Sequence, residues 1–199
     1  SDSNTTTMTG NITTTGNSAH GIQLDSSDSN IVNMTGDITT SGRNASGIRL
    51  DTSDSNTIAM TGDISTSGTD AYGVYILTSN DNTTSITGNV ATTGEDADAL
   101  KISGGDRNTI NVVGDISATN GGGFYIDTSD ENTINVTGNT TVGGSSDSAF
   151  DINQSNSNTL SITGDVTTSA GSSHGFEVGG DSNNITMTGN ISTTGTASH

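Results

Sequence analysis

Apolar and polar residues alternate along the chain in short stretches, and the same pattern returns about every 26 residues. A glycine after a stretch such as MTG or ITG marks each of eight copies, at Gly10, Gly36, Gly62, Gly88, Gly114, Gly138, Gly164 and Gly189. The successive spacings are 26, 26, 26, 26, 24, 26 and 25 residues. Such a period predicts a stacked repeat, in which each copy buries its apolar face against its neighbours.

Each copy holds three apolar stretches that are too short for helices and are bounded by Gly, Asn, Asp and Ser. This pattern is typical of half-buried strands joined by turns. We therefore expect an all-β fold, a parallel β-solenoid with about 26 residues and three short strands per coil. Its length corresponds to about 7.5 coils. With no linker-like segment in between, residues 1–199 are expected to form a single continuous domain.

Equivalent positions of successive copies indicate which side chains point inward. Two columns are apolar throughout: Ile22, Ile48, Val74, Leu100, Phe124, Phe150 and Phe176, and then Leu24, Leu50, Ile76, Ile102, Ile126, Ile152 and Val178. The column between them varies freely, as an outward position of a strand does. In one copy Thr140 replaces the usual Ile and Val142 replaces the usual Thr two residues later, an exchange that predicts that both positions face the core.

The most regular polar column is asparagine, and we expect it to form an internal amide ladder at a bend of each coil. Its members are Asn4, Asn30, Asn56, Asn82, Asn108, Asn132, Asn158 and Asn183.

A second column in the same turns is rich in aspartate: Asp2, Asp28, Asp54, Asp106, Asp130 and Asp181, with Asn80 and Asn156 between them. Carboxylates about 4.8 Å apart repel one another, so a ladder of them predicts a hard cation such as calcium, held with turn carbonyls and hydroxyls. The alternative is that each Asp bonds to the backbone of its own turn. The sequence predicts no cofactor other than calcium.

Composition changes the picture in two ways. Only 27% of the residues are hydrophobic and 27 are glycine. This composition by itself is typical of disorder, but the regular repeat indicates a folded solenoid. The formal charge of −18, from 22 acidic and four basic residues, argues against nucleic acid and anionic membranes as partners. There is no cysteine, which excludes disulfides, and there is no long apolar stretch, so no membrane insertion is expected.

Two surface features are candidate binding sites. Arg49, Tyr72, Tyr75, Lys101 and Tyr125 fall on neighbouring coils, where they could stack on a host glycan or contact a surface protein; the alternative is scattered surface variation. Outward Ser/Thr pairs such as Thr13 with Thr15 and Thr39 with Ser41 form an array similar to the face of ice-binding β-helices. No Ser/His/Asp set or phosphate loop is present, and we predict no catalytic site.

Residues 19–42 and 45–68 share the pattern A-x-G-I-x-L-x-x-S-x-x-N, followed after three further residues by M-T-G-D-I-x-T-S-G. This pattern resembles the passenger repeats of bacterial autotransporter adhesins and related secreted right-handed β-helix surface proteins. The resemblance implies a right-handed parallel β-helix in an extracellular, non-enzymatic stalk or adhesin. Neither end carries an atypical capping copy, so we expect either a segment of a longer array or a unit that stacks end to end into fibres. The function expected is a stiff acidic rod, with adhesion or ice binding as alternatives.

Overall fold

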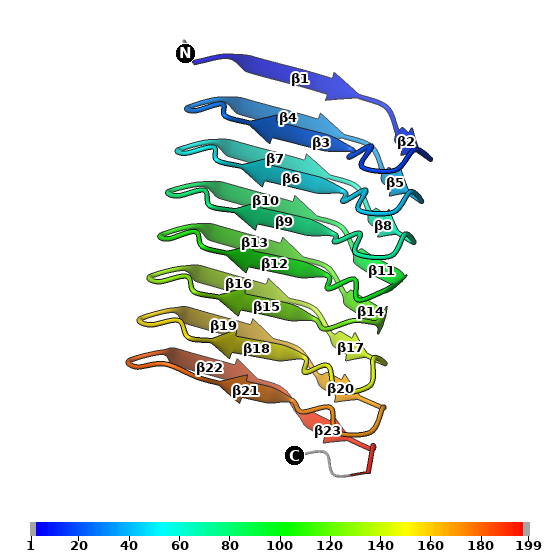
Figure 1. Cartoon of the computed structure of the whole chain (residues 1–199), viewed down its shortest axis with the longest axis vertical. Coiled ribbons are helices and arrows are strands. Elements are labelled where there is room, and N and C mark those ends of the chain that lie inside the picture. The colour runs from blue at the N-terminus through cyan, green and yellow to red at the C-terminus, as the bar shows by residue number, and fades with distance from the viewer. Residues whose placement is uncertain (1–2, 197–199) are drawn as a thin grey trace.

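A computed structural model describes residues 3–196, and within that range the chain forms 23 β-strands and no helix. The strands wind into successive coils stacked along one axis, with β1 at one end of the stack and β23 at the other (Figure 1). Each coil contributes one strand to each of three parallel sheets. The predicted parallel β-solenoid of about 26 residues per coil is therefore confirmed.

The first sheet, named sheet A, consists of strands of five residues each. They are β1 (Thr5–Thr9), β4 (Ile31–Thr35), β7 (Thr57–Thr61), β10 (Thr83–Thr87), β13 (Thr109–Val113), β16 (Thr133–Thr137), β19 (Thr159–Thr163) and β22 (Asn184–Thr188).

The strands of the second sheet, sheet B, begin two residues after the repeat glycine. They are β2 (Ile12–Thr14), β5 (Ile38–Thr40), β8 (Ile64–Thr66), β11 (Val90–Glu95), β14 (Ile116–Asn120), β17 (Thr140–Val142), β20 (Val166–Thr168) and β23 (Ile191–Thr193). All except β11 and β14 have three residues.

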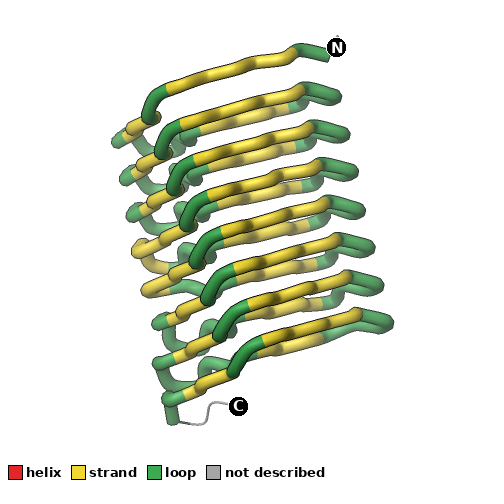
Figure 2. The backbone as a smooth tube through the Cα atoms, turned by 180° about the vertical axis from the view of Figure 1, so that it is seen from behind, coloured by secondary structure: helices red, strands yellow, loops and turns green. Residues whose placement is uncertain are grey.

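The third sheet, sheet C, has seven strands. They are β3 (Ile22–Asp25), β6 (Ile48–Asp51), β9 (Val74–Leu77), β12 (Leu100–Ser103), β15 (Phe124–Asp127), β18 (Phe150–Asn153) and β21 (Phe176–Val178). Figure 2 shows from behind how strands of one sheet lie one beneath another while loops close each coil on both sides.

Strand register follows the sequence repeat without slippage in sheets A and C. Met34 pairs with Met60 in sheet A, and Leu50 pairs with Ile76 in sheet C. Each side chain therefore lies above its own counterpart one copy later. A one-residue slip would turn every apolar side chain outward, so the buried columns determine the register.

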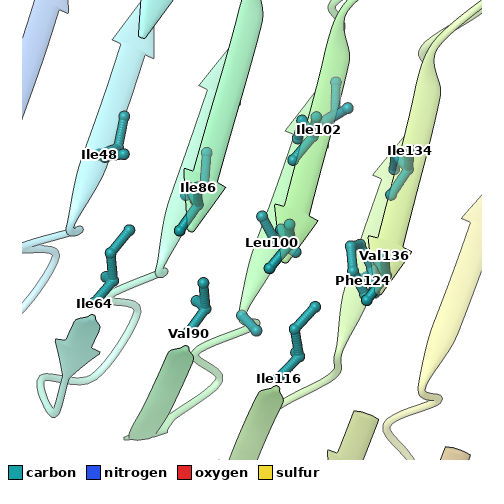
Figure 3. Packing of buried hydrophobic residues seen from close by; sticks show 14 of the residues in the cluster. Ile48, Ile64, Ile86, Val90, Leu100, Ile102, Ile116, Phe124, Ile134 and Val136 are labelled. Atoms are coloured by element: carbon teal, nitrogen blue, oxygen red, sulfur yellow. The ribbon is translucent and has the colours of Figure 1, made fainter. Parts of the chain in front are cut away.

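The core lies inside the coils and contains the predicted apolar columns (Figure 3). It also contains inward side chains of sheet A that were not among those columns, such as Met60 and Val112. Phe124, Phe150 and Phe176 stack face to face, with ring centroids 4.7 and 4.8 Å apart. Thr140 and Val142 are both fully buried, which confirms that the exchange in this copy occurs at two inward positions.

The repeat glycine is required by both conformation and space. Gly36 has a φ of +137°, and a Cβ built on it would lie 2.3 Å from the carbonyl oxygen of Gly10 in the preceding coil. A side chain there would be strained and would also push the coils apart. This explains why the same glycine marks every copy.

The asparagine column forms a continuous ladder in the turns between sheets C and A. Asn82 is fully buried; its Oδ1 accepts the backbone N–H of Asn56 at 2.8 Å, and its Nδ2 donates to the Ser53 carbonyl at 2.8 Å. The same backbone-to-amide bond links all eight asparagines: Asn4, Asn30, Asn56, Asn82, Asn108, Asn132, Asn158 and Asn183. The ladder thus satisfies turn backbone groups that water cannot reach.

Candidate functional site

The outward column of sheet C collects the basic and aromatic side chains of neighbouring coils. Strand register places Arg49 beside Tyr75, Tyr75 beside Lys101 and Lys101 beside Tyr125. The Arg49 guanidinium lies 5.1 Å from the Tyr75 ring centroid, and the Lys101 Nζ lies 4.9 Å from that of Tyr125. These are cation–π distances.

Tyr72 joins this column from the loop before β9. Its ring centroid is 4.9 Å from that of Tyr75, and the Lys101 Nζ lies 4.8 Å from the Tyr72 centroid and 3.3 Å from its hydroxyl. Lys101 is therefore held between Tyr72 and Tyr125. The structure brings all five of the predicted recognition residues into one continuous cluster.

A cleft of about 450 Å³ opens beside this cluster. Its lining consists of Asp70, Tyr72, Asp96, Asp98, Lys101, Gly122, Phe124, Tyr125, Ser146, Asp147, Ser148 and Asp151. Tyr75 and Arg49 are not part of the lining; they extend the cluster along the outward face of sheet C. The volume lies within the range of small-molecule binding sites.

The cleft forms where the repeat is shortest. The copy between Gly114 and Gly138 has 24 residues, and its missing residues come from the loop that ends at Gly121, Gly122 and Gly123. Gly122 stands where the neighbouring coils carry Asp98 and Ser148, and a Cβ on it would lie 3.0 Å from Asp98 Oδ1 and 3.1 Å from the Ser148 carbonyl oxygen. Both distances are tighter than a Cβ normally makes, so the glycine allows the Asp98 carboxylate and the Ser148 carbonyl oxygen to lie close to the backbone at this position.

The electrostatics of the cleft disfavour its carboxylates. Burial raises the pKa of Asp98 to about 6, against the opposing effects of the Gly122 N–H and Lys101. Burial also raises the pKa of Asp151 to about 6, with Glu177 and Asp127 adding repulsion. The pKa of Asp147 is raised as well, by burial and by Asp96. Burial raises the pKa of the Tyr72 hydroxyl to about 12, so this group is a neutral hydrogen-bonding group at neutral pH.

The aspartate column predicted to bind calcium forms a hydrogen-bonded ladder. Asp28 Oδ1 accepts the backbone N–H of Asp54 at 2.8 Å, and Asp106 Oδ1 accepts that of Asp130 at 2.8 Å. Asp181 donates its N–H to Asn156, and Asp2 lies outside the described residues. Each of these hydrogen bonds joins two successive coils, and none of the three lies within the turn of the Asp itself. Within residues 3–196 no group of three or more His, Cys, Asp or Glu side chains is placed to hold a metal ion, and calcium binding stays a prediction.

The outward Ser/Thr array lies on sheet B, where Thr13, Thr39 and Ser65 are exposed and in register. Sheet A carries a second array that the sequence reading did not single out. Its strands contain no charged residue, and an outward column on it is nearly all threonine: Thr9, Thr35, Thr61, Thr87, Val113, Thr137, Thr163 and Thr188. Ice binding stays a prediction that a thermal hysteresis measurement would test.

Sequence reasoning missed the acidic half of the cleft, namely Asp98, Asp147 and Asp151, with Gly122 in contact with Asp98. Two signals pointed to it. The position two residues before each sheet C strand varies strongly, as His20, Ser46, Tyr72, Asp98, Gly122, Ser148 and His174, and the shortened loop falls within that series. A local break in an otherwise strict repeat is where a site is expected.

Comparisons with models of known protein families, with curated proteins and with solved structures find no match to this chain. In the part of the chain that the structure describes, no helix is long and apolar enough to cross a membrane.

Proposed function

We propose that the chain is a structural repeat of a secreted cell-surface or extracellular filament protein, a stiff acidic rod whose coils continue end to end. Secretion is inferred from the resemblance of the repeat to autotransporter passengers. The observation that carries the rod function is the set of unbroken side-chain ladders along the axis. Beside the asparagine and aspartate ladders, a third one runs from Asn11, whose Oδ1 accepts the Asp37 N–H at 2.9 Å, to Asp165, which accepts that of Asn190 at 2.8 Å.

The last coil supports end-to-end association because it exposes apolar side chains that inner coils bury. Val178 is 47% exposed and Ile191 is 52% exposed. Their register partners in the preceding coil, Ile152 and Val166, are 1% and 0% exposed. One more coil beyond β21 and β23 would cover both residues.

The first coil offers the matching surface. An apolar hollow of about 250 Å³ opens there, and its lining includes Met8, Ile12, Ile22 and Leu24. Leu24 belongs to the same column as Val178, and Ile12 to the same column as Ile191. A second copy stacked in register, or further coils of the same kind, would continue all three sheets across the junction.

Charge favours association at the ends over association at the sides. The chain carries a formal charge of −18, so the flanks of two rods repel each other.

We expect purified protein to form long, unbranched fibres with an axial repeat of about 4.8 Å, the spacing between strands. Electron microscopy with and without a calcium chelator tests this. Fibres that disappear on chelation would assign calcium to the aspartate column, whereas only short rods of about 35 Å in both samples would contradict stacking.

A substitution at Gly16 separates stacking from folding. In Gly42, the equivalent residue one coil later, a Cβ would lie 1.9 Å from the Gly16 carbonyl oxygen, whereas a Cβ on Gly16 meets nothing closer than Ala19 at 3.4 Å. A stacked copy would place the equivalent Gly195 against Gly16. Gly16→Ala should therefore abolish fibres and leave the monomer folded, while the side-facing Thr39→Ala should leave fibres intact. Fibres of Gly16→Ala like those of the wild type would contradict in-register stacking.

The aromatic cluster favours a second function, adhesion, in which the rod presents a binding face made of Tyr72, Tyr75, Lys101 and Tyr125. Loss of glycan-array binding on changing Tyr72 and Tyr75 to Ala would support it. An array without any bound glycan, for wild-type protein shown to be folded, would contradict glycan adhesion and leave the rod function untouched.

A further inference from the structure

The cleft beside Lys101 carries far more negative charge than its single ammonium can offset. Five carboxyl groups line it, those of Asp70, Asp96, Asp98, Asp147 and Asp151, against Lys101 alone. Among these five, only Asp70 has an additional cationic partner, Arg43, whose Nη2 lies 3.4 Å away and whose side chain is 67% exposed. A ligand that enters the cleft gains most if it brings a positive charge, because the charge then offsets repulsion among partly buried carboxylates.

The shape and hydrogen-bonding groups of the cleft suit a hydroxylated ring. Tyr72 and Tyr125 are half-buried and offer aromatic surface on either side of Lys101, and aromatic faces pack well against the C–H face of a sugar. The hydroxyls of Ser146 and Ser148 and the carboxylates of the cleft are the groups that sugar hydroxyls pair with. The Gly122 N–H donates to Asp98 Oδ1 at 2.8 Å and so fixes the position of that carboxylate in the cleft.

We propose that this cleft binds an amino sugar, a pyranose with a free ammonium group, whose ring packs on the tyrosines and whose ammonium pairs with Asp98 and Asp151. The proposal rests on the adhesion function and names its ligand class. An acidic sugar would add repulsion to five carboxyl groups, and a neutral one would leave the excess charge in place. A basic peptide would satisfy the charge, but it would leave the hydroxyls of Ser146 and Ser148 without the several hydroxyl partners that a sugar ring offers.

The acidity of the site leads to a pH dependence. Asp98 faces Lys101, Asp147, Asp151 and the Gly122 N–H, and Asp151 faces Glu177 and Asp127. Because the pKa values of Asp98 and Asp151 lie near 6, both carboxylates are ionised at pH 7.5 and protonated at pH 5. Binding of a cationic sugar should weaken on this acidification.

The test is titration calorimetry of the folded 199-residue protein at pH 7.5 with chitobiose, the dimer of glucosamine. Two control ligands separate ring from charge. N,N′-diacetylchitobiose has the same sugar rings without the positive charges, and trilysine has positive charges without the rings. We expect chitobiose to bind at least about tenfold more tightly than either, since a hydrogen bond to a charged group typically contributes this much. Asp98→Asn and Asp151→Asn should each weaken binding by about the same factor. Asp25→Asn makes the same charge change on the same sheet two coils before Tyr75, and should have no effect.

The outcomes separate the ligand class from adhesion itself. Equal binding of the acetylated dimer would overturn the requirement for an ammonium while leaving glycan adhesion standing. If trilysine binds as tightly as chitobiose, the assignment of a sugar ligand is wrong and a basic peptide is the better candidate. If no probe binds although circular dichroism shows folded protein, the amino-sugar assignment is wrong, and the glycan array decides adhesion separately.

Discussion

Gly42 lies so close to Gly16 of the preceding coil that a Cβ built on Gly42 would come within 1.9 Å of the Gly16 carbonyl oxygen. The two glycines occupy the same place in successive copies, yet only one of them is covered by a preceding coil. The two glycines are equivalent in the repeat, but only Gly16 has room for a Cβ.

Gly42→Ala should therefore destabilise the protein by about 3 kcal/mol or more, because the methyl group meets backbone and not a flexible side chain. Gly16→Ala should change the free energy of unfolding by less than about 0.5 kcal/mol. Urea unfolding, in dilute samples that sedimentation shows to be monomeric, measures both values. Equal effects of the two substitutions would show that coil spacing can relax around an added methyl group.

Two buried threonines should respond to the same substitution with opposite signs. Thr84 is fully buried between Ile58 and Ile110, and within the described chain its hydroxyl has no hydrogen-bond partner. Thr66 is equally buried, but its hydroxyl donates to the Ala71 carbonyl at 2.6 Å.

Thr84→Val removes an unsatisfied polar group without changing the volume, and should raise the free energy of unfolding by about 1 kcal/mol. Thr66→Val removes a satisfied bond, leaves the Ala71 carbonyl buried, and should lower the free energy of unfolding by about 1–2 kcal/mol. Thermal and urea unfolding of both variants give the comparison. Destabilisation by Thr84→Val would mean that its hydroxyl is satisfied in solution, for instance by a bound water.

The asparagine ladder should contribute strongly to stability at each step. Asn82→Ala leaves the Asn56 N–H and the carbonyl oxygens of Ser53 and Asn80 without their side-chain partner. A loss of about 3 kcal/mol is expected, since each buried group left unpaired costs about 1 kcal/mol or more. Asn33→Ala, on the outward face of sheet A, is the control and should change stability by less than about 0.5 kcal/mol. Similar unfolding midpoints for the two variants would contradict a stabilising ladder.

The fold was predictable from sequence because a solenoid places each residue above its own counterpart. The apolar columns and the Thr140/Val142 exchange predicted which positions face the core, and register then followed from burial. The Lys101 and Tyr125 part of the cleft was also predictable, because these two residues share one outward column with Tyr75.

The acidic part of the cleft was not predictable in the same way. Asp98 and Asp147 lie in loops, where the repeat varies and strand periodicity gives no direction for a side chain. The contact of Asp98 with the Gly122 N–H depends on the backbone path through Gly121 and Gly122, where the coil is two residues shorter than most of its neighbours. Neither the path nor the resulting burial of Asp98 follows from column membership alone.

Burial of Asp98 makes the stability of the protein depend on pH in a direction opposite to that of an ion-paired carboxyl group. The folded state raises the pKa of Asp98 from 3.8 to about 6, so the folded protein holds this proton more tightly than the unfolded chain. The stabilisation is fully present below the ordinary pKa and is lost as the pH rises through about 6. At pH 7.5 the protein therefore bears the full cost of a buried carboxylate.

Asp98→Asn should remove that cost while keeping an oxygen that accepts the Gly122 N–H at 2.8 Å. We expect the variant to be more stable than wild type by about 1–2 kcal/mol at pH 7.5, since one pKa unit corresponds to about 1.4 kcal/mol. The difference should vanish near pH 3.5, where wild-type Asp98 is protonated in both states. Urea unfolding at the two pH values measures the difference, and Asp25→Asn, an exposed change of the same charge, should stay within about 0.5 kcal/mol of wild type at both. A variant less stable than wild type at pH 7.5 would show that Lys101 and the Gly122 N–H outweigh burial at this carboxylate.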